Sequence, residues 1–247
     1  MGSSRFPDKP MADILGMPMI GHVYQRVKMS KLLNEVYVAT CDQIIFDYIE
    51  SMGGKAIMTS DCHERCTDRC AEAMLKIEQD ENIKVDIMVM VQGDEPLTFP
   101  EMIDEATQPM LDDASIKITN LVADLENLEE FENPNEVKVV MDKQGFALYF
   151  SREPIPSRKK GALEVPMKKQ VCVIPFARDF LLEYNTMEPT PLEIIESVDM
   201  MRILENGQKV KMIPTAYKTK AVDTKEDLNR VIEIMKKDNL IQEYNHV

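Results

Sequence analysis

The sequence lacks the long hydrophobic run that a membrane-spanning helix requires. Such a helix needs about 20 consecutive apolar residues, whereas the apolar segment 87–91 has only the length of a strand. Basic residues are also scarce, because 29 Lys and Arg stand against 43 Asp and Glu, for a formal net charge of −14. Nucleic acids and anionic membranes are bound by basic surfaces, so neither is expected as a partner.

The cysteine pattern of disulfide-bonded or zinc-binding proteins is missing as well. The five cysteines are odd in number, no secretory leader precedes them, and Cys62, Cys66 and Cys70 stand four residues apart without a Cys-x-x-Cys pair elsewhere. This pattern predicts reduced thiols in the cytoplasm and argues against structural zinc. We expect these three cysteines to line one face of a helix as small apolar residues.

No repeat, low-complexity segment or Pro/Gly/Ser linker divides the 247 residues, so a single domain over 1–247 is predicted. Strand and helix patterns alternate in the first two-thirds, which indicates an α/β fold with a mostly parallel, Rossmann-like sheet. Strands are expected at 35–40, 55–58, 85–91, 116–122, 136–141, 146–150, 170–175 and 209–213, and helices at 42–52, 68–79, 180–184, 191–204 and 225–236. The later strands, with few helices between them, predict an antiparallel extension.

Polar residues follow the most apolar of these strands. The segment 85–91 ends in Gln92, Gly93, Asp94, Glu95 and Pro96. Ligands of open parallel sheets bind beyond the carboxyl ends of strands, and a carboxylate there suits Mg²⁺. Taken alone, the pair of acids is more typical of an acidic turn after a strand than of a metal site.

A second strand-end acid, Asp223, precedes the last predicted helix. Asp223 or Thr224 could instead be the N-cap of that helix. Two such aspartates are what metal-assisted nucleotidyl transfer needs. Near the start, a small-residue turn at 2–4 is followed by Arg5 and Lys9, which suits a triphosphate, although a solvated terminus would look the same.

A series of short motifs runs along nearly the whole chain, namely Ser4-Arg5-Phe6-Pro7-Asp8-Lys9-Pro10, Gly16-Met17-Pro18-Met19-Ile20, Val38-Ala39-Thr40, Val91-Gln92-Gly93-Asp94-Glu95-Pro96, Asn133-Pro134-Asn135, Val137-Lys138-Val139-Val140, Ala147-Leu148-Tyr149-Phe150-Ser151-Arg152, Ile155-Pro156, Pro191-Leu192-Glu193 and Val222-Asp223-Thr224. In this order they resemble the motifs of the Kdo (3-deoxy-manno-octulosonate) cytidylyltransferases and, more distantly, of the acylneuraminate cytidylyltransferases. The resemblance implies a nucleotidyltransferase sheet with a β-rich dimerisation extension. It also implies a homodimer that transfers CMP from CTP to the anomeric hydroxyl of a 2-keto acid sugar, releasing pyrophosphate, in surface polysaccharide biosynthesis.

The resemblance also implies roles for individual residues. Those for CTP are Ser3, Ser4, Arg5, Lys9, Arg69 and Gln92; those for a small anionic acceptor are Gln92, Arg152, Gln170 and Asp199. Asp94 and Asp223 would hold Mg²⁺ and, with Lys9, carry the catalysis. No covalent intermediate is needed, because the metal and the cations position the groups and stabilise charge.

The chain departs from the family pattern in three places. The family begins with a buried strand ending in Ile-Pro-Ala-Arg, which we expect to be missing before Met1. Gln170 and Ile174 replace a His and a Tyr of the acceptor strand, and Asp199 replaces a Glu, which indicates an altered acceptor pocket. Arg65 and Cys66 replace Ser-Gly in the base-binding turn, where Gly permits close approach.

Two alternatives therefore stay open. One is a cytidylyltransferase that acts on a phosphonate acceptor. The other is a catalytically impaired nucleotide-binding protein.

Overall fold

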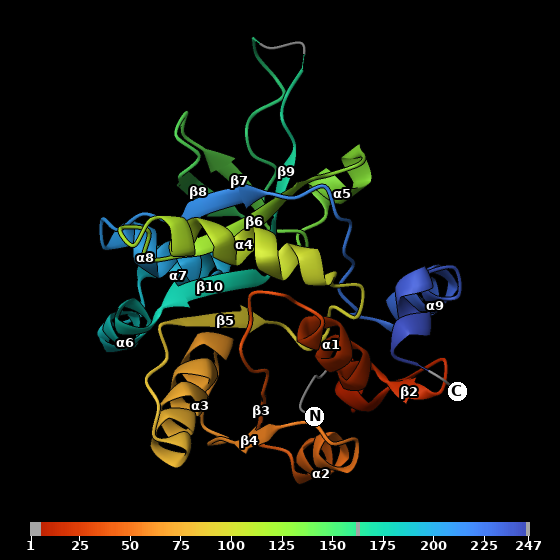
Figure 1. Ribbon diagram of the computed structural model, residues 1–247. Helices are drawn as coiled ribbons and strands as arrows, with labels where there is room; N and C mark the ends of the chain where they lie inside the picture. Colours follow the sequence, from red (N-terminus) through yellow and green to blue (C-terminus); the bar gives the residue numbers. More distant parts are fainter. Residues whose placement is uncertain (1–5, 162–163, 246–247) are drawn as a thin grey trace.

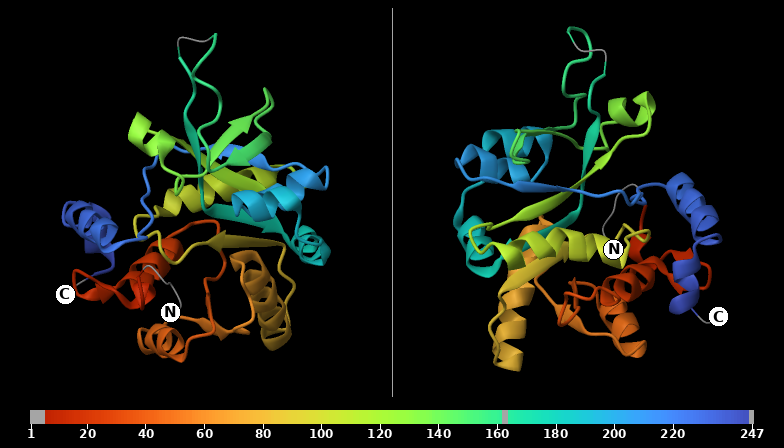
Figure 2. Two further views of the ribbon diagram at one scale, coloured as in Figure 1. Left: turned by 180° about the vertical axis from the view of Figure 1, so that it is seen from behind. Right: turned by 45° about the horizontal axis from the view of Figure 1, so that its top comes forward.

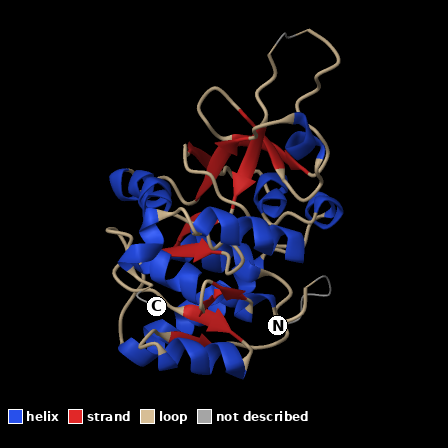
Figure 3. Ribbon diagram, turned by 90° about the vertical axis from the view of Figure 1, so that its right-hand side faces the viewer, coloured by secondary structure: helices blue, strands red, loops and turns tan. Residues whose placement is uncertain are grey.

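The computed structural model describes residues 6–161 and 164–245. They form a mixed α/β fold, with a strand-rich upper part and a lower part in which helices flank short strands (Figures 1 and 3). The predicted α/β class is thus confirmed, although the strand pairs among the described residues are mostly antiparallel and not mostly parallel. None of the helices in these two ranges combines the length and the apolar character that a membrane span needs.

The lower part contains a strand, helix, strand unit (Figure 1). It consists of β3 (Val38–Thr40), α2 (Gln43–Ser51) and β4 (Ala56–Met58), and α3 (Cys66–Glu81) and β5 (Ile87–Val91) follow it in the chain. β3 and β4 pair in parallel, as strands joined by a crossover helix do. The helices expected at 42–52 and 68–79 are confirmed, with small shifts at their ends.

The start of α3 corrects one expectation about the cysteines. Arg65 is extended, with φ −112° and ψ 145°, and the helix begins at Cys66. Cys62 lies before the helix in a turn, where its backbone N–H donates to Ser60 Oγ at 3.3 Å. The three cysteines therefore do not share one helical face, because this local turn competes with helix formation.

Two consecutive strands at the centre of the molecule, β9 and β10, belong to different sheets. β10 (Val173–Ala177) pairs antiparallel with β5, whereas β9 (Lys168–Val171) lies in a five-stranded sheet of order β11-β6-β9-β7-β8. The other members of that sheet are β6 (Thr119–Asp124), β7 (Lys138–Met141), β8 (Ala147–Ser151) and β11 (Lys211–Pro214). Cys172 separates β9 from β10, so the strand predicted at 170–175 is divided between the two sheets.

Most neighbours in the five-stranded sheet are antiparallel, which matches the predicted extension. β9 pairs antiparallel with β6 and β7, and β7 with β8, whereas β11 and β6 are parallel. The connection between β8 and β9, described at 152–161 and 164–167, projects away from this sheet in each view (Figures 1 and 2).

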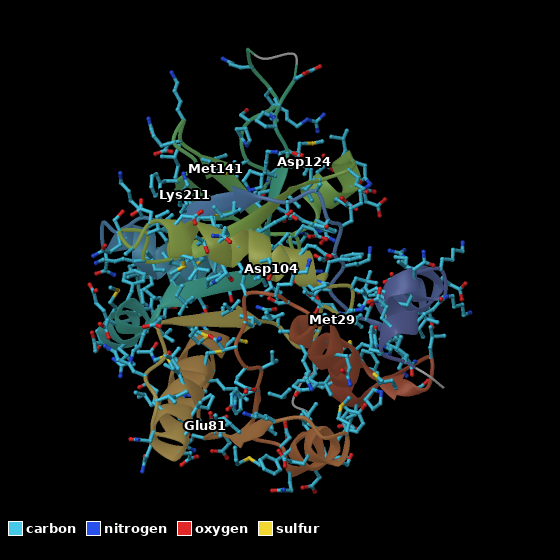
Figure 4. All side chains as sticks on the ribbon, viewed as in Figure 1. Met29, Glu81, Asp104, Asp124, Met141 and Lys211 are labelled. Carbon is cyan, nitrogen blue, oxygen red and sulfur yellow. The ribbon has the colours of Figure 1, made fainter. Side chains whose placement is uncertain are left out.

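The helix α4 (Pro100–Asp112) packs on β6 and β10, although the sequence patterns gave no helix there. Pro100 occupies the first turn, where proline is tolerated because its missing N–H would be unpaired anyway. Asp104 on α4 accepts hydrogen bonds from Ser30 Oγ at 2.6 Å and from the backbone N–H of Lys31 at 3.1 Å. These bonds hold the segment after Met29 against α4 (Figure 4).

The helix predicted at 191–204 is two helices, α7 (Pro191–Glu196) and α8 (Met200–Glu205). Ser197 ends α7 in the left-handed conformation, with φ 52°, which a continuous helix cannot contain. At the start of α7, Glu193 accepts a hydrogen bond from the backbone N–H of Thr190, at 3.2 Å. The break turns 197–199 toward the cleft described below.

The remaining elements lie around these sheets (Figure 2). They are η1 (Lys9–Met11), β1 (Asp13–Ile14), β2 (Met17–Pro18), α1 (Met19–Lys28), α5 (Leu128–Glu132), α6 (Arg178–Thr186), α9 (Lys225–Met235) and η2 (Asn239–Glu243).

Candidate functional site

A cleft of about 310 Å³ lies where β5, the β9–β10 junction, the start of α3 and the α7–α8 break meet. Its charged lining comprises six carboxylates and three cations, namely Glu64, Asp94, Glu95, Glu136, Asp199 and Asp223 with Arg65, Arg152 and Lys169. Polyanionic ligands would be repelled by this excess of acid unless additional cations entered with them. The cleft therefore suits an anionic substrate that brings a divalent metal ion.

The two aspartates singled out in the sequence approach the same ammonium group. Lys9 Nζ lies 2.7 Å from Asp94 Oδ2 and 3.5 Å from Asp223 Oδ1. The backbone N–H of Val222 donates to the carbonyl of Asp94 at 2.9 Å, which ties the segment before α9 to the turn after β5. Both aspartates thus belong to one site, although 128 positions separate them in the chain.

The same pair of carboxylates fits Mg²⁺. Lys9 already places one positive charge between them, and Oδ1 of Asp94, although buried, has no hydrogen-bond partner among the described residues. No cluster of three or more His, Cys, Asp or Glu in the described ranges forms a ready metal cage. Mg²⁺ is commonly bound by one or two carboxylates together with substrate phosphates, so the pair is sufficient for that mode.

The turn after β5 also contains a buried acid. Glu95 is 6% exposed, and burial raises its pKa to about 7, with a further increase from the neighbouring charge of Asp94. A hydrogen bond from Thr219 opposes the shift. In the same turn a Cβ at Gly93 would lie 2.9 Å from Cδ1 of Ile20, so the turn lies close to α1 at this point. The sequence pattern placed Glu95 in the turn but gave no sign of its burial.

Gln170 lines the cleft from the end of β9. Its Nε2 donates to Oδ1 of buried Asn120 at 2.6 Å, and Nδ2 of Asn120 donates to the carbonyl of Val171 at 2.7 Å. This chain fixes the orientation of the Gln170 amide. A hydrogen-bonding group therefore stands at a fixed place on the cleft wall.

Arg152 lines the cleft from just beyond β8, and its guanidinium is held by backbone carbonyls. Nε donates to Glu196 at 2.6 Å, Nη1 to Pro134 at 2.8 Å and Nη2 to Ser197 at 3.2 Å. The same arginine thus connects the 133–135 turn to the α7–α8 break. It stabilises the shape of this wall.

Asp199 reaches the cleft from the α7–α8 break. Its Oδ2 accepts a hydrogen bond from Thr67 Oγ1 at 2.7 Å, and its Oδ1 lies 3.3 Å from Nη1 of Arg65. Burial raises the pKa of Asp199, while the hydrogen bond from Thr67 and the charge of Arg65 oppose this shift. Asp199 and Arg65 are therefore in contact at the cleft, Asp199 from the α7–α8 break and Arg65 from the residue before α3.

Most of the residues predicted for the site come together. Gln92, Asp94, Arg152, Gln170, Asp199 and Asp223 all line the cleft, and Lys9 joins them through its ion pairs. Arg69 does not line it; its Nη1 donates to Thr59 Oγ1 at 2.5 Å and to the carbonyl of Ser60 at 3.1 Å. Ser3, Ser4 and Arg5 lie outside the described residues.

Comparison with known proteins gives the same family from sequence and from structure. The profile of the cytidylyltransferase family matches residues 1–212. A 3-deoxy-manno-octulosonate cytidylyltransferase of Geobacter metallireducens is 42% identical over 241 residues, covering 94% of this chain and 92% of the relative. The enzyme of the same name from Geotalea uraniireducens is 43% identical over 245 residues, covering 95% of each chain.

Solved structures agree. The structure of a CMP:2-keto-3-deoxy-manno-octonic acid synthetase in complex with CTP matches with a TM-score of 0.88 and 36% identity, over 96% of this chain and 95% of that one. The 4-diphosphocytidyl-2C-methyl-D-erythritol synthase of Anaerococcus prevotii matches with a TM-score of 0.61 at 13% identity, over 92% and 93% of the two chains. The second likeness supports the fold alone.

Proposed function

Because the chain belongs to the cytidylyltransferase family, we propose that it transfers CMP from CTP to Kdo and releases pyrophosphate. The observation that carries this proposal is the meeting of Asp94, Asp223 and Lys9 at one end of the cleft. Relatives named for the Kdo reaction span nearly the whole chain, which supports the choice of acceptor.

The reaction is a nucleotidyl transfer. The anomeric hydroxyl oxygen of the sugar attacks the α-phosphorus of CTP, the bond from that phosphorus to the β-phosphate oxygen breaks, and pyrophosphate leaves. Mg²⁺, held by Asp94 and Asp223, would neutralise phosphate charge and align the attacking and leaving oxygens. Lys9 supplies a fixed positive charge beside the same carboxylates, which also favours a triphosphate.

The other predicted roles are consistent with this reaction. Gln92 and Gln170 offer amides on the wall between the two sheets, and Asp199 offers a carboxylate that can accept a sugar hydroxyl. Arg152 shapes the opposite wall. Positioning of this kind supplies much of the rate enhancement in transfers that need no covalent intermediate.

We extend the proposal to the setting of the reaction. All five cysteines are free, which fits the reducing cytoplasm. Leu148 on the edge strand β8, with Ile194 and Ile195 on α7, expose 61%, 63% and 74% of their surface. Such apolar groups near a sheet edge support a homodimer.

The test is pyrophosphate release by the purified chain with Mg²⁺, CTP and a panel of acceptors. We expect release with Kdo and CTP, and little with UTP or ATP. A second 2-keto acid sugar and a phosphonate complete the panel. Release that requires the phosphonate, or that does not depend on any acceptor, would overturn the proposed acceptor.

A further inference from the structure

An anionic acceptor that enters this cleft needs a cation to bind its charged group. Among the residues that the structure describes, three cations line the cleft, namely Arg65, Arg152 and Lys169. The described contacts of these three differ greatly in strength. They therefore indicate which cation is available to a ligand.

Arg152 is committed to the protein. Each of its three guanidinium nitrogens donates to a backbone carbonyl, at 2.6, 2.8 and 3.2 Å. Turning this side chain toward a ligand would break all three hydrogen bonds at once, including the short bond to the partly buried carbonyl of Glu196. Arg152 therefore supports the wall more readily than it leaves it.

Lys169 is also engaged. Its Nζ lies 3.0 Å from Oε2 of Glu136, and only 13% of its side chain is exposed. Glu136 lines the cleft too, so the pair presents a nearly neutral surface to a ligand. An acceptor anion would have to compete with a closely placed carboxylate.

Arg65 is held much more loosely. Nη1 makes two contacts, each of 3.3 Å, with Oδ1 of Asp199 and Oγ of Ser197, and 29% of the side chain is exposed. Contacts of this length are weak compared with a charge-assisted hydrogen bond of about 2.8 Å. Asp199 keeps its bond from Thr67 at 2.7 Å when Arg65 moves, so breaking the pair leaves no carboxylate unpaired.

We propose that Arg65 binds the anionic group of the acceptor, which takes the place of Asp199 on the guanidinium. Asp199 then remains on Thr67 and is free to accept a hydroxyl of the same acceptor. Arg65 is thus a specificity-determining residue, supplied by the segment that immediately precedes α3. This inference rests on the proposed function, because it assigns a residue to the acceptor of that reaction.

The test compares Kdo with its uncharged carboxamide on four forms of the full chain, the wild type, Arg65→Gln, Arg65→Lys and Arg230→Gln. Arg65→Gln removes the charge, and Arg230→Gln makes the same change on the exposed side of α9, away from the cleft. The KM for Kdo should rise about 10- to 100-fold in Arg65→Gln, in line with the loss of one charged hydrogen-bonded contact. The KM for CTP and the thermal midpoint should stay near the wild-type values.

The acid-to-amide ratio of kcat/KM gives the decisive readout. The wild type and Arg230→Gln should prefer the acid strongly, and Arg65→Gln should lose most of that preference. Arg65→Lys should retain an intermediate preference, because lysine keeps the charge but not the planar fork. An unchanged ratio in Arg65→Gln would overturn the assignment.

Failure of the proposed function would look different. Wild-type pyrophosphate release with Kdo tests that function by itself. If the wild type released none, calorimetric titration of Kdo into the wild type and Arg65→Gln would still decide the matter. Binding that is lost with Arg65 would support its role, and equal binding, or none, would contradict it.

Discussion

Asp94 is the residue on which the site depends most. Its Oδ2 accepts a hydrogen bond from Lys9 Nζ at 2.7 Å, and its Oδ1 is buried without a hydrogen-bond partner among the described residues. Such an arrangement is unfavourable unless a ligand completes it. We therefore propose that Asp94 is a metal ligand and not only part of an acidic turn, the other interpretation that its sequence allows.

We expect Asp94→Asn to reduce the rate of pyrophosphate release about 100-fold or more, because a neutral amide binds Mg²⁺ poorly and metal stabilisation is worth several kcal/mol. The measurement is initial rate against Mg²⁺ concentration with saturating CTP and Kdo. Asp80→Asn, an exposed change on α3, is the control and should behave as the wild type. A rate for Asp94→Asn within twofold of the control would contradict the assignment.

Some residues of the cleft could be predicted from the sequence, and others could not. Asp94 and Asp223 could be found because each follows an extended segment at a point where a turn or helix begins. The burial of Glu95 and the contact of Arg65 with Asp199 could not be found. They depend on elements far apart in the chain, and local patterns carry no information about such contacts.

At the scale of elements, the α7–α8 break places Asp199 in the cleft, and a buried ion pair holds the two helices together. Arg202 Nε and Nη2 donate to Glu193 Oε2 and Oε1 at 2.7 and 2.6 Å, with side chains 6% and 1% exposed. The guanidinium also lies 4.6 Å from the ring centroid of Tyr184. Apolar spacing over 191–204 predicts one helix, because it contains no sign of the left-handed Ser197.

We expect Glu193→Ala to lower the free energy of unfolding by about 3–5 kcal/mol, since it leaves the charge of Arg202 buried and unpaired. Urea unfolding followed by circular dichroism measures this change. Glu188→Ala, at an exposed position before α7, is the matched control and should cost less than about 0.5 kcal/mol. A similar small cost for Glu193→Ala would mean that the pair does not hold the two helices.

The helix α4 was not predicted from the sequence. It contains Pro100 and Pro109, and prolines usually indicate loops or helix ends. Here one proline lies in the first turn and the other is tolerated inside the helix, which packs between α1 and the strands β6 and β10. Tertiary packing outweighed local preference.

At the scale of the whole molecule, the end of the described chain returns to α1. His22 Nε2 donates to the carbonyl of Ile14 at 2.7 Å, so Nδ1 accepts the hydroxyl hydrogen of Tyr244 at 3.0 Å. The Tyr244 oxygen in turn accepts a hydrogen bond from Nε of buried Arg26 at 2.9 Å, and Nη2 of Arg26 forms an ion pair with Oδ2 of Asp238 at 2.5 Å. This network holds η2, and the α9 segment that follows Asp223, against α1.

The network predicts a dependence of stability on pH. Burial lowers the pKa of His22 below its ordinary value of 6.5, and the charge of Arg26 lowers it further. The unfolded chain therefore binds a proton more readily than the folded chain. The contribution of His22 is complete above pH 6.5 and is lost as the pH falls from there toward the lowered folded pKa.

Urea unfolding at pH 7.5, 6.5 and 5.5 checks this prediction. We expect the wild type to lose stability over this range and His22→Gln to lose less, because glutamine does not titrate. Asn229→Gln, an exposed change on α9 that adds and removes no titratable group, is the control and should keep the wild-type slope. Equal slopes for the wild type and His22→Gln would show that His22 is not the group responsible.

In the proposed reaction the protein transfers the CMP group of CTP to Kdo. The most direct measurement follows the label from CTP labelled with ³²P at the α-phosphate, and separately at the γ-phosphate, in the presence of Mg²⁺ and Kdo. We expect the α label to appear in a CMP-sugar and the γ label in pyrophosphate, in equal amounts. Release of the γ label as inorganic phosphate, with the α label left in CDP, would contradict it.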